Sequence, residues 1–154
     1  MIYIGIDLGT SAVKLLAMDE NGTILKTVSK EYPLFFPHPG WSEQNPEDWF
    51  TQSVEGMKEL TEGIDRSKVA GIGFGGQMHG LVTLDENDKV IRPAILWNDG
   101  RSQKETEYLN NEIGKEKLSA YTANIAFAGF TAPKILWMKK NEPEKFAKIA
   151  KIML

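Results

Sequence analysis

The feature that most constrains the fold is an acid that ends an apolar run and is followed at once by a tight turn. Residues 2–7 are mostly apolar and β-branched, which is typical of a strand buried on both faces, and Asp7 is the last of them. After the segment Gly9–Ser11, a second apolar run covers residues 12–18. The pattern predicts two strands joined by a turn, with one carboxylate beside the turn.

This turn has two interpretations, a structural hairpin or a phosphate site, and so short a motif does not separate them by spacing. A Walker-A loop is excluded because a strand, not a helix, follows the turn. In a phosphate site, Gly9, Thr10 and Ser11 would offer backbone N–H groups and hydroxyls to phosphate oxygens, and Asp7 would hold Mg²⁺. An ionisable group at the end of an apolar strand must be solvated, paired or metal-bound, which favours this second interpretation. Lys14 is either a solvated strand residue or a phosphate contact.

The rest of the chain alternates strands and helices. The Asn21-Gly22 pair is a strong hairpin signal, so a strand over 23–32 is expected to complete a three-stranded antiparallel meander. Asn45 is the predicted N-cap of a helix over 46–60. Further strands are expected at 69–75, 81–84, 90–97 and 149–154, with 81–84 and 90–97 paired through the polar turn 85–88. Further helices are expected at 101–113, at 133–140 with Thr131 as N-cap, and at 143–147. This order predicts an α/β fold with a mixed sheet.

A glycine-rich segment, residues 71–76, matches the dinucleotide-binding pattern G-x-G-x-x-G. That function is rejected because the motif must open a helix, whereas residues 77–84 have no helical periodicity. Glycines inside a strand instead mark a bulge or a place where a ligand approaches the backbone. Gln77, Met78 and His79 follow, and they would offer polar groups and an adaptable apolar wall to a polyhydroxylated ligand. The alternative for His79 is a structural histidine with its hydrogen bonds satisfied.

Asp99 and Arg101 lie at an expected strand-to-helix junction. They either pair with each other or cap the helix, or they bind a ligand at the carboxyl end of a strand, where open α/β sheets bind ligands. Trp41 has two similar interpretations, since it could fill the core or line a sugar site.

Composition excludes several classes of function. The formal net charge is -3, and Lys and Arg are scattered, so no basic surface for nucleic acid or an anionic membrane is expected. The chain has no cysteine, which excludes disulfides and thiolate chemistry and fits the reducing cytoplasm. His38 and His79 are the two histidines, too few for a histidine-rich metal site. One domain without a membrane span is expected from 154 residues.

Five segments carry a family resemblance: YIGIDLGTSAVK, PGWSEQNPEDW, GQMHGLV, RPAILWNDGR and GFTAPKILW. In their order and spacing, the chain resembles the FGGY carbohydrate kinases along essentially its whole length. The resemblance implies an α/β, ribonuclease-H-like (actin-like ATPase) domain, with a mixed sheet and helices on both faces. It also implies ATP and Mg²⁺ as cofactors and a sugar as the substrate.

The same resemblance implies roles for individual residues. Asp7 would lie by Mg²⁺ and the transferred phosphoryl group, Gly9 and Thr10 would face the phosphates, and Met78 and His79 would touch the sugar. The catalytic base and most of the adenosine pocket would come from a second, C-terminal domain. Residues 1–154 are therefore expected to be an N-terminal domain with little activity alone, and the face toward the other domain would also allow a homodimer. The alternatives are a kinase for ribulose, gluconate or another polyol, and a non-catalytic nucleotide-binding assembly module.

Overall fold

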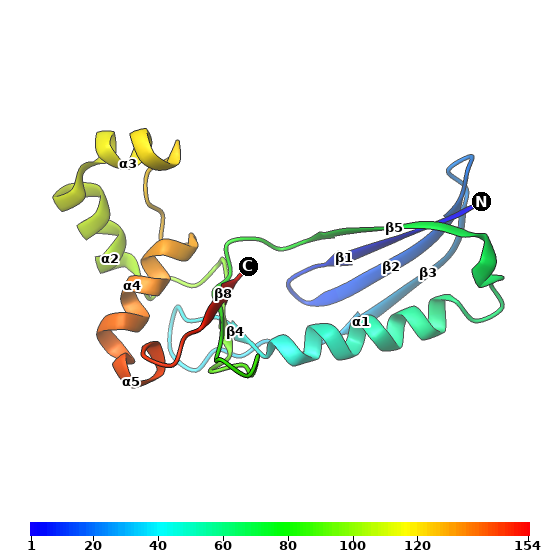
Figure 1. The fold of residues 1–154 in the computed structure, drawn as a ribbon, viewed down its shortest axis with the longest axis horizontal. Helices are drawn as coiled ribbons and strands as arrows, with labels where there is room; N and C mark the ends of the chain where they lie inside the picture. The colour runs from blue at the N-terminus through cyan, green and yellow to red at the C-terminus, as the bar shows by residue number, and fades with distance from the viewer. The chain divides into compact units, whose positions relative to one another are not determined.

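The computed structural model describes residues 1–154 and divides into two compact units (Figure 1). Unit 1 consists of Met1–Leu34 and Glu47–Gln77, and unit 2 consists of Phe35–Pro46 and Met78–Leu154. Each unit has a hydrophobic core of its own. None of the helices combines the length and the apolar character needed to cross a membrane.

Unit 1 is built on a four-stranded sheet in the order β3-β2-β1-β5. The strands are β1 (Ile2–Leu8), β2 (Ala12–Asp19), β3 (Ile24–Glu31) and β5 (Val69–Gly76). β1 pairs antiparallel with β2 and parallel with β5, so the sheet is mixed. The predicted meander and mixed sheet are confirmed. Gly22, in the turn between β2 and β3, has a φ of +83°, which glycine adopts without strain.

One face of this sheet is covered by α1 (Pro46–Leu60), which begins at the predicted proline. Ile4 and Ile6 of β1 and Leu15 of β2 are buried in the core beneath the helix. The helix adds apolar side chains three and four residues apart, as an amphipathic helix does. A 3₁₀ turn, η1 (Arg66–Lys68), then leads into β5.

Gly56 lets α1 pack closely on the sheet. A Cβ atom at this position would lie 2.5 Å from Cδ1 of Leu15, which is fully buried, so the Leu15 side chain would have to shift within the core. We expect Gly56→Val to lower the free energy of unfolding by about 2 kcal/mol through overpacking. Thr51→Val, on the exposed side of the same helix, should change it by less than about 0.5 kcal/mol. Denaturant unfolding checks both variants, and equal stabilities would contradict the close contact.

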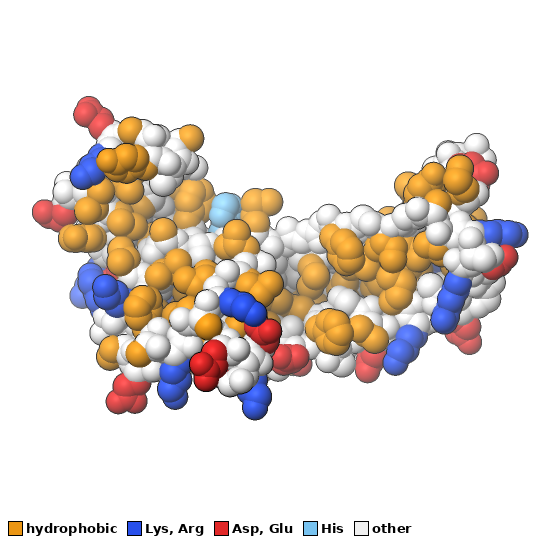
Figure 2. Space-filling model, in the orientation of Figure 1, with side chains coloured by type: hydrophobic (Ala, Val, Ile, Leu, Met, Phe, Trp, Pro, Cys, Tyr) orange, Lys and Arg blue, Asp and Glu red, His pale blue; other side chains and the backbone are white.

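The opposite face of the unit 1 sheet carries no helix of this unit, although the family resemblance predicts helices on both faces. Tyr3, Gly5 and Asp7 lie on this open face. β5 is the edge strand, and its Ile72 and Phe74 are 51% and 75% exposed. Figure 2 shows hydrophobic side chains gathered over the sheet of unit 1 and charged side chains along its helical side.

Unit 2 combines two short antiparallel ladders with several helices. The ladders join β4 (Glu43–Gln44) to β7 (Ala94–Ile95) and β6 (Val82–Leu84) to β8 (Lys151–Met153). The helices are α2 (Gln103–Tyr108), the π-helix η2 (Leu109–Gly114), α3 (Lys115–Thr122), α4 (Thr131–Asn141) and α5 (Pro143–Phe146). Their packing buries Leu81, Ile95, Trp137 and Met138.

Unit 2 differs from the sequence prediction in three places. The strand predicted over 90–97 is reduced to β7 and isolated bridges, because Pro93 has no N–H for a ladder. Its predicted antiparallel pairing with 81–84 is confirmed only at the bridges Leu81–Ile95 and Leu84–Val90, and β6 also pairs with β8. The helix predicted over 101–113 begins only at Gln103. Thr131 is the first residue of α4 and not its N-cap, which is Phe130.

Candidate functional site

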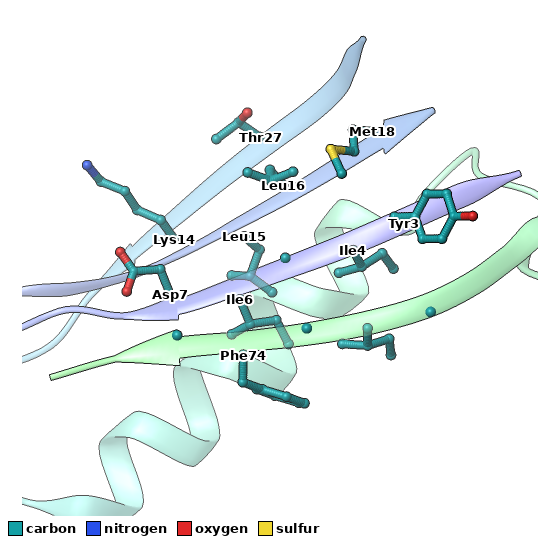
Figure 3. Close-up of a pocket in the computed structure, with 15 residues that line it drawn as sticks. Tyr3, Ile4, Ile6, Asp7, Lys14, Leu15, Leu16, Met18, Thr27 and Phe74 are labelled. Atoms are coloured by element: carbon teal, nitrogen blue, oxygen red, sulfur yellow. The ribbon is translucent and has the colours of Figure 1, made fainter. Parts of the chain in front are cut away.

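Asp7 lies on the open face of unit 1 because of the alternation along β1. Ile4 and Ile6 point toward α1, so Asp7, an odd number of residues away from each, points to the other side (Figure 3). Its side chain is exposed, and its cross-strand neighbour is the exposed Lys14 of β2. The carboxylate therefore meets solvent at the end of a strand whose other face is buried.

Glycines of β5 leave the sheet without side chains beside this carboxylate. Tyr3, Gly5 and Asp7 lie next to Gly71, Gly73 and Gly75 of β5 in the parallel register. A Cβ atom at Gly73 would meet nothing within 4 Å, and one at Gly75 would lie 3.8 Å from Oδ1 of Asp7.

The same residues line a hollow of about 790 Å³ in unit 1. On the β5 side it is lined by Gly71, Gly73 and Gly75, which carry no side chain, together with Ile72 and Phe74. The glycine-rich segment therefore leaves room for another group to approach the backbone next to the acid, as the sequence predicts.

The turn after β1 is held by Tyr32, which sequence reasoning missed. The buried Tyr32 hydroxyl donates to the carbonyl oxygen of Gly9, and its backbone N–H donates to the Ser11 carbonyl (3.3 Å). Burial, together with the nearby negative charge of Asp7, raises the pKa of Tyr32 to about 12, so the hydroxyl stays a donor at neutral pH. Two hydrogen bonds from Tyr32 thus hold the turn that carries Gly9, Thr10 and Ser11.

The acid and the turn fit a magnesium ion that arrives with a nucleotide. No group of three or more Asp, Glu, His or Cys side chains forms a ready-made metal cage in the chain. Mg²⁺ keeps several waters and typically binds through one or two carboxylates plus substrate phosphates. One exposed carboxylate beside a bare glycine floor is suited to that mode.

Of the predicted sugar-binding residues, Gln77 belongs to unit 1, and Met78, His79, Asp99 and Arg101 belong to unit 2. Gln77 ends unit 1, where its backbone N–H donates to the Leu8 carbonyl (2.7 Å). Met78 and His79 begin the second segment of unit 2, and the Met78 side chain is 61% exposed. The His79 ring stacks on the Phe130 ring, with centroids 4.4 Å apart and planes 18° from parallel. An exposed apolar side chain and an imidazole supported by stacking thus come from two consecutive residues.

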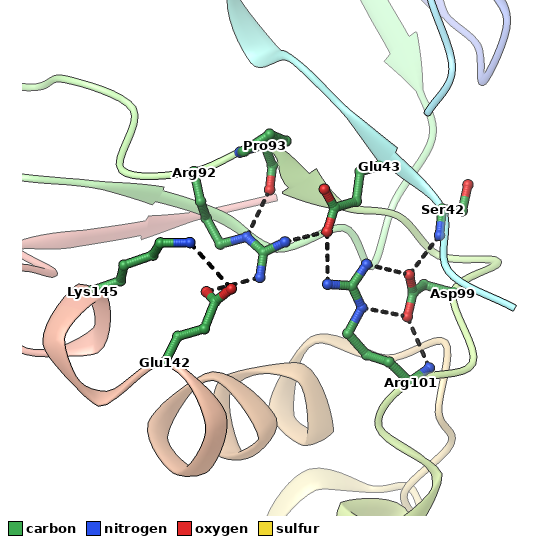
Figure 4. Close-up of polar contacts among 8 residues, drawn as sticks. All are labelled: Ser42, Glu43, Arg92, Pro93, Asp99, Arg101, Glu142 and Lys145. Carbon is green, nitrogen blue, oxygen red and sulfur yellow. Dashed lines mark hydrogen bonds and ion pairs between the residues drawn. The ribbon is translucent and has the colours of Figure 1, made fainter. Parts of the chain in front are cut away.

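Asp99 and Arg101 are held in a buried ionic network (Figure 4). Arg101 donates from Nε and Nη2 to the two carboxylate oxygens of Asp99, at 2.9 and 2.7 Å, and both side chains are fully buried. Asp99 also accepts from the backbone N–H of Ser42 at 2.6 Å. Of the two interpretations, pairing is what the structure contains: these charges are satisfied within unit 2 and have no exposed surface.

The network extends to residues that sequence reasoning did not connect. Arg101 lies 2.7 Å from Oε1 of Glu43, which also pairs with Arg92, and Arg92 pairs with Glu142 (2.9 Å). The Arg101 guanidinium lies 3.7 Å from the ring centroid of Trp41.

Trp41 packs edge-on against Trp137, which belongs to the core. It also lines a hollow of about 420 Å³ with His38 and Asn98. Trp41 thus fills the core on one side and faces open space on the other, so both of its interpretations keep a structural basis.

Comparison with known proteins gives one consistent result. The family model for the FGGY family of carbohydrate kinases, N-terminal domain, matches residues 2–154. The chain is 46% identical to the xylulose kinases of Lactococcus lactis, over 157 residues, and Bacillus subtilis, over 153 residues. These matches cover 100% and 98% of this chain but only 31% and 30% of the two relatives.

The crystal structure of xylulose kinase from Rhodospirillum rubrum has a TM-score of 0.93 at 30% identity, over 99% of this chain and 32% of that one. The predicted α/β, actin-like ATPase fold is confirmed by this similarity. Because the family model covers almost every residue, the chain belongs to the FGGY family of carbohydrate kinases.

Proposed function

We propose that this chain is the N-terminal domain of an ATP-dependent sugar kinase that phosphorylates D-xylulose. The observation that carries the proposal is the exposed carboxylate of Asp7, which lies near the end of the half-buried strand β1, beside a fixed turn and the glycines of β5. The similarity to xylulose kinases supports the choice of sugar.

Unit 1 would serve the nucleotide. Asp7 would hold Mg²⁺, which when bound neutralises charge on the phosphates and on the group in transfer. Gly9, Thr10 and Ser11 would direct N–H groups and hydroxyls toward phosphate oxygens. Lys14, the cross-strand neighbour of Asp7, would add a positive charge on the same face.

Unit 2 would serve the sugar. Met78 would contact its carbon skeleton, and His79 would hydrogen-bond its hydroxyls. Gln77, the last residue of unit 1 and next to Met78 in the chain, is proposed to hydrogen-bond the sugar as well. For Asp99 and Arg101 we propose a supporting role, because their fully buried side chains cannot reach a ligand without rearrangement. Through Ser42, they fix the loop that carries Trp41.

Two parts of a complete kinase would come from outside these 154 residues, which span about 31% of their relatives. One is a general base, typically contributing ~10²–10⁴-fold, that takes the proton of the attacking hydroxyl. The other is a closing domain that excludes water. The exposed Ile72 and Phe74 on the free edge of β5 are consistent with a surface that a further segment covers.

The test compares this chain with a completed kinase, meaning residues 1–154 joined to the part of the Bacillus subtilis xylulose kinase that follows the matched region. We expect the chain alone to form almost no D-xylulose phosphate from ATP and Mg²⁺, because base and closure are missing. The completed kinase should turn over steadily, with removal of Mg²⁺ by EDTA abolishing the activity. A coupled assay for ADP measures both.

A panel of D-xylulose, D-ribulose and gluconate, at equal concentrations, checks the substrate. D-xylulose should have the highest kcat/KM, and a preference for another sugar would contradict that part of the proposal. Nucleotide binding without activity toward any sugar would favour the assembly module instead.

A further inference from the structure

The backbone of His79 has a conformation that needs external support. Its φ is +67°, in the left-handed region that residues with a Cβ rarely adopt. Such conformations persist when surrounding contacts determine them, and they cluster at functional sites. The contacts that hold His79 are therefore of interest in their own right.

Lys134 of α4 supplies one of these contacts. Its Nζ donates to the carbonyl oxygen of His79 at 2.8 Å and also to the carbonyl oxygen of Gly129. The residue has 0% relative exposure, so an ammonium group is buried with two backbone carbonyls as its acceptors. Burial lowers the pKa of Lys134 to about 8, with the positive charge of Arg101 adding to the effect and Asp99 opposing it. Burying an ammonium group is costly unless its charge is hydrogen-bonded, and here the two carbonyl oxygens supply those hydrogen bonds.

The second carbonyl connects Lys134 to the side chain of His79 as well. Gly129 directly precedes Phe130, whose ring stacks on the His79 imidazole, and Phe127 packs edge-on against Phe130. Gly129 itself packs closely against the backbone of Trp97, since a Cβ atom added at Gly129 would lie 2.5 Å from the Trp97 carbonyl oxygen. One ammonium group thus ties together the backbone of His79 and the segment that supports its ring.

We propose that Lys134 is a positioning residue that fixes the backbone and ring orientation of His79 for sugar binding. The role in sugar binding rests on the proposed function. The tether, meaning the hydrogen bonds from Lys134 to the carbonyl oxygens of His79 and Gly129, rests only on contacts within unit 2. Lys134 would not touch the sugar. It would act through His79 and through the Gly129–Phe130 segment.

The tether can be tested without any sugar, because His38 and His79 are the chain's two histidines. In ¹H–¹³C NMR spectra, His79→Gln identifies the His79 ring signal, which stacking on Phe130 should shift upfield. We expect Lys134→Met to move that signal toward its unstacked position and to leave the His38 signal in place. Lys139→Met, at an exposed position of the same helix, is the matched control and should move neither. Should Lys134→Met fail to fold, Lys134→Gln keeps a shorter neutral donor and takes its place.

The proposed role of Lys134 in sugar binding is tested in the completed kinase. A misplaced binding group typically costs about 10²-fold, so the KM for D-xylulose should rise at least roughly tenfold with Lys134→Met, while the KM for ATP stays unchanged. A merely structural lysine would lower stability without this selective effect. An unmoved His79 signal would overturn the tether, and a moved signal with an unchanged sugar KM would overturn its role in binding. If the unsubstituted completed kinase phosphorylates no sugar, the proposed function fails, but the NMR result still decides the tether.

Discussion

Asp7→Asn is expected to reduce kcat of the completed kinase by a factor of about 10³, the largest effect on activity of any single substitution in this chain. Removing one preorganised electrostatic group commonly costs ~10²–10³ in kcat, and Asp7 would be the chain's one carboxylate at the turn. Asparagine keeps the shape of the side chain but not its charge. Because Asp7 is exposed, the fold should be unaffected.

The dependence of the activity on Mg²⁺ concentration shows whether the loss in Asp7→Asn comes from weaker binding of the ion. If Asp7 helps to hold the ion, Asp7→Asn should require a higher Mg²⁺ concentration for half-maximal activity, at unchanged KM for D-xylulose. Asp88→Asn is a matched control, since Asp88 is exposed, pairs only with the exposed Lys151 and has a positive φ that asparagine tolerates. Retention of more than a tenth of the activity by Asp7→Asn would show that the carboxylate is not part of the reaction site.

The sequence was sufficient for the parts of unit 1 that depend on neighbours along the chain. The apolar run ending in Asp7, the Asn21-Gly22 turn and the helix start at Pro46 each encode a local structure, and these elements were predicted correctly. The expectation that the first strand is buried on both faces was wrong, because only the face of β1 that carries Ile4 and Ile6 is buried. The glycines at 71, 73 and 75 also carry their own signal, because alternation places them on one face. Their position beside Asp7 follows only from the parallel register, which sequence does not give.

Unit 2 was predicted less well because its structure depends on distant partners. β6 and β8 lie within the strands predicted at 81–84 and 149–154, but they are about 70 residues apart in the chain, so the sequence did not show that they pair with each other. Lys134 likewise looks like an ordinary polar residue of an amphipathic helix, and only its contact with His79, 55 residues earlier, shows otherwise.

Asp99 and Arg101 show the same limitation at the candidate site. Charged residues at a strand end are typical both of ligand sites and of ion pairs. What decides between these is Glu43, 58 residues before Arg101, together with Ser42 and Trp41 from the same segment. Nothing in the local sequence around Asp99 points to that segment.

The largest expected effect on stability follows from this network. Arg101→Met should lower the free energy of unfolding by about 3–5 kcal/mol, since it leaves buried carboxylates on Asp99 and Glu43 without their shared cation. The lost stacking on Trp41 adds to this. Arg66→Met, at an exposed position in η1, is the matched control and should change stability by less than about 0.5 kcal/mol.

Unfolding in urea, followed by tryptophan fluorescence, measures the loss, because Trp41 and Trp137 both lie against the Arg101 guanidinium. A second substitution identifies the cause. If the penalty is the orphaned charge, adding Asp99→Asn to Arg101→Met should recover part of the lost stability, whereas for unrelated packing defects the two losses would add. In the completed kinase, a ligand role for Arg101 would instead appear as a large rise in the KM for sugar at nearly unchanged stability. That result would show that Asp99 and Arg101 bind the sugar and do not only support the fold.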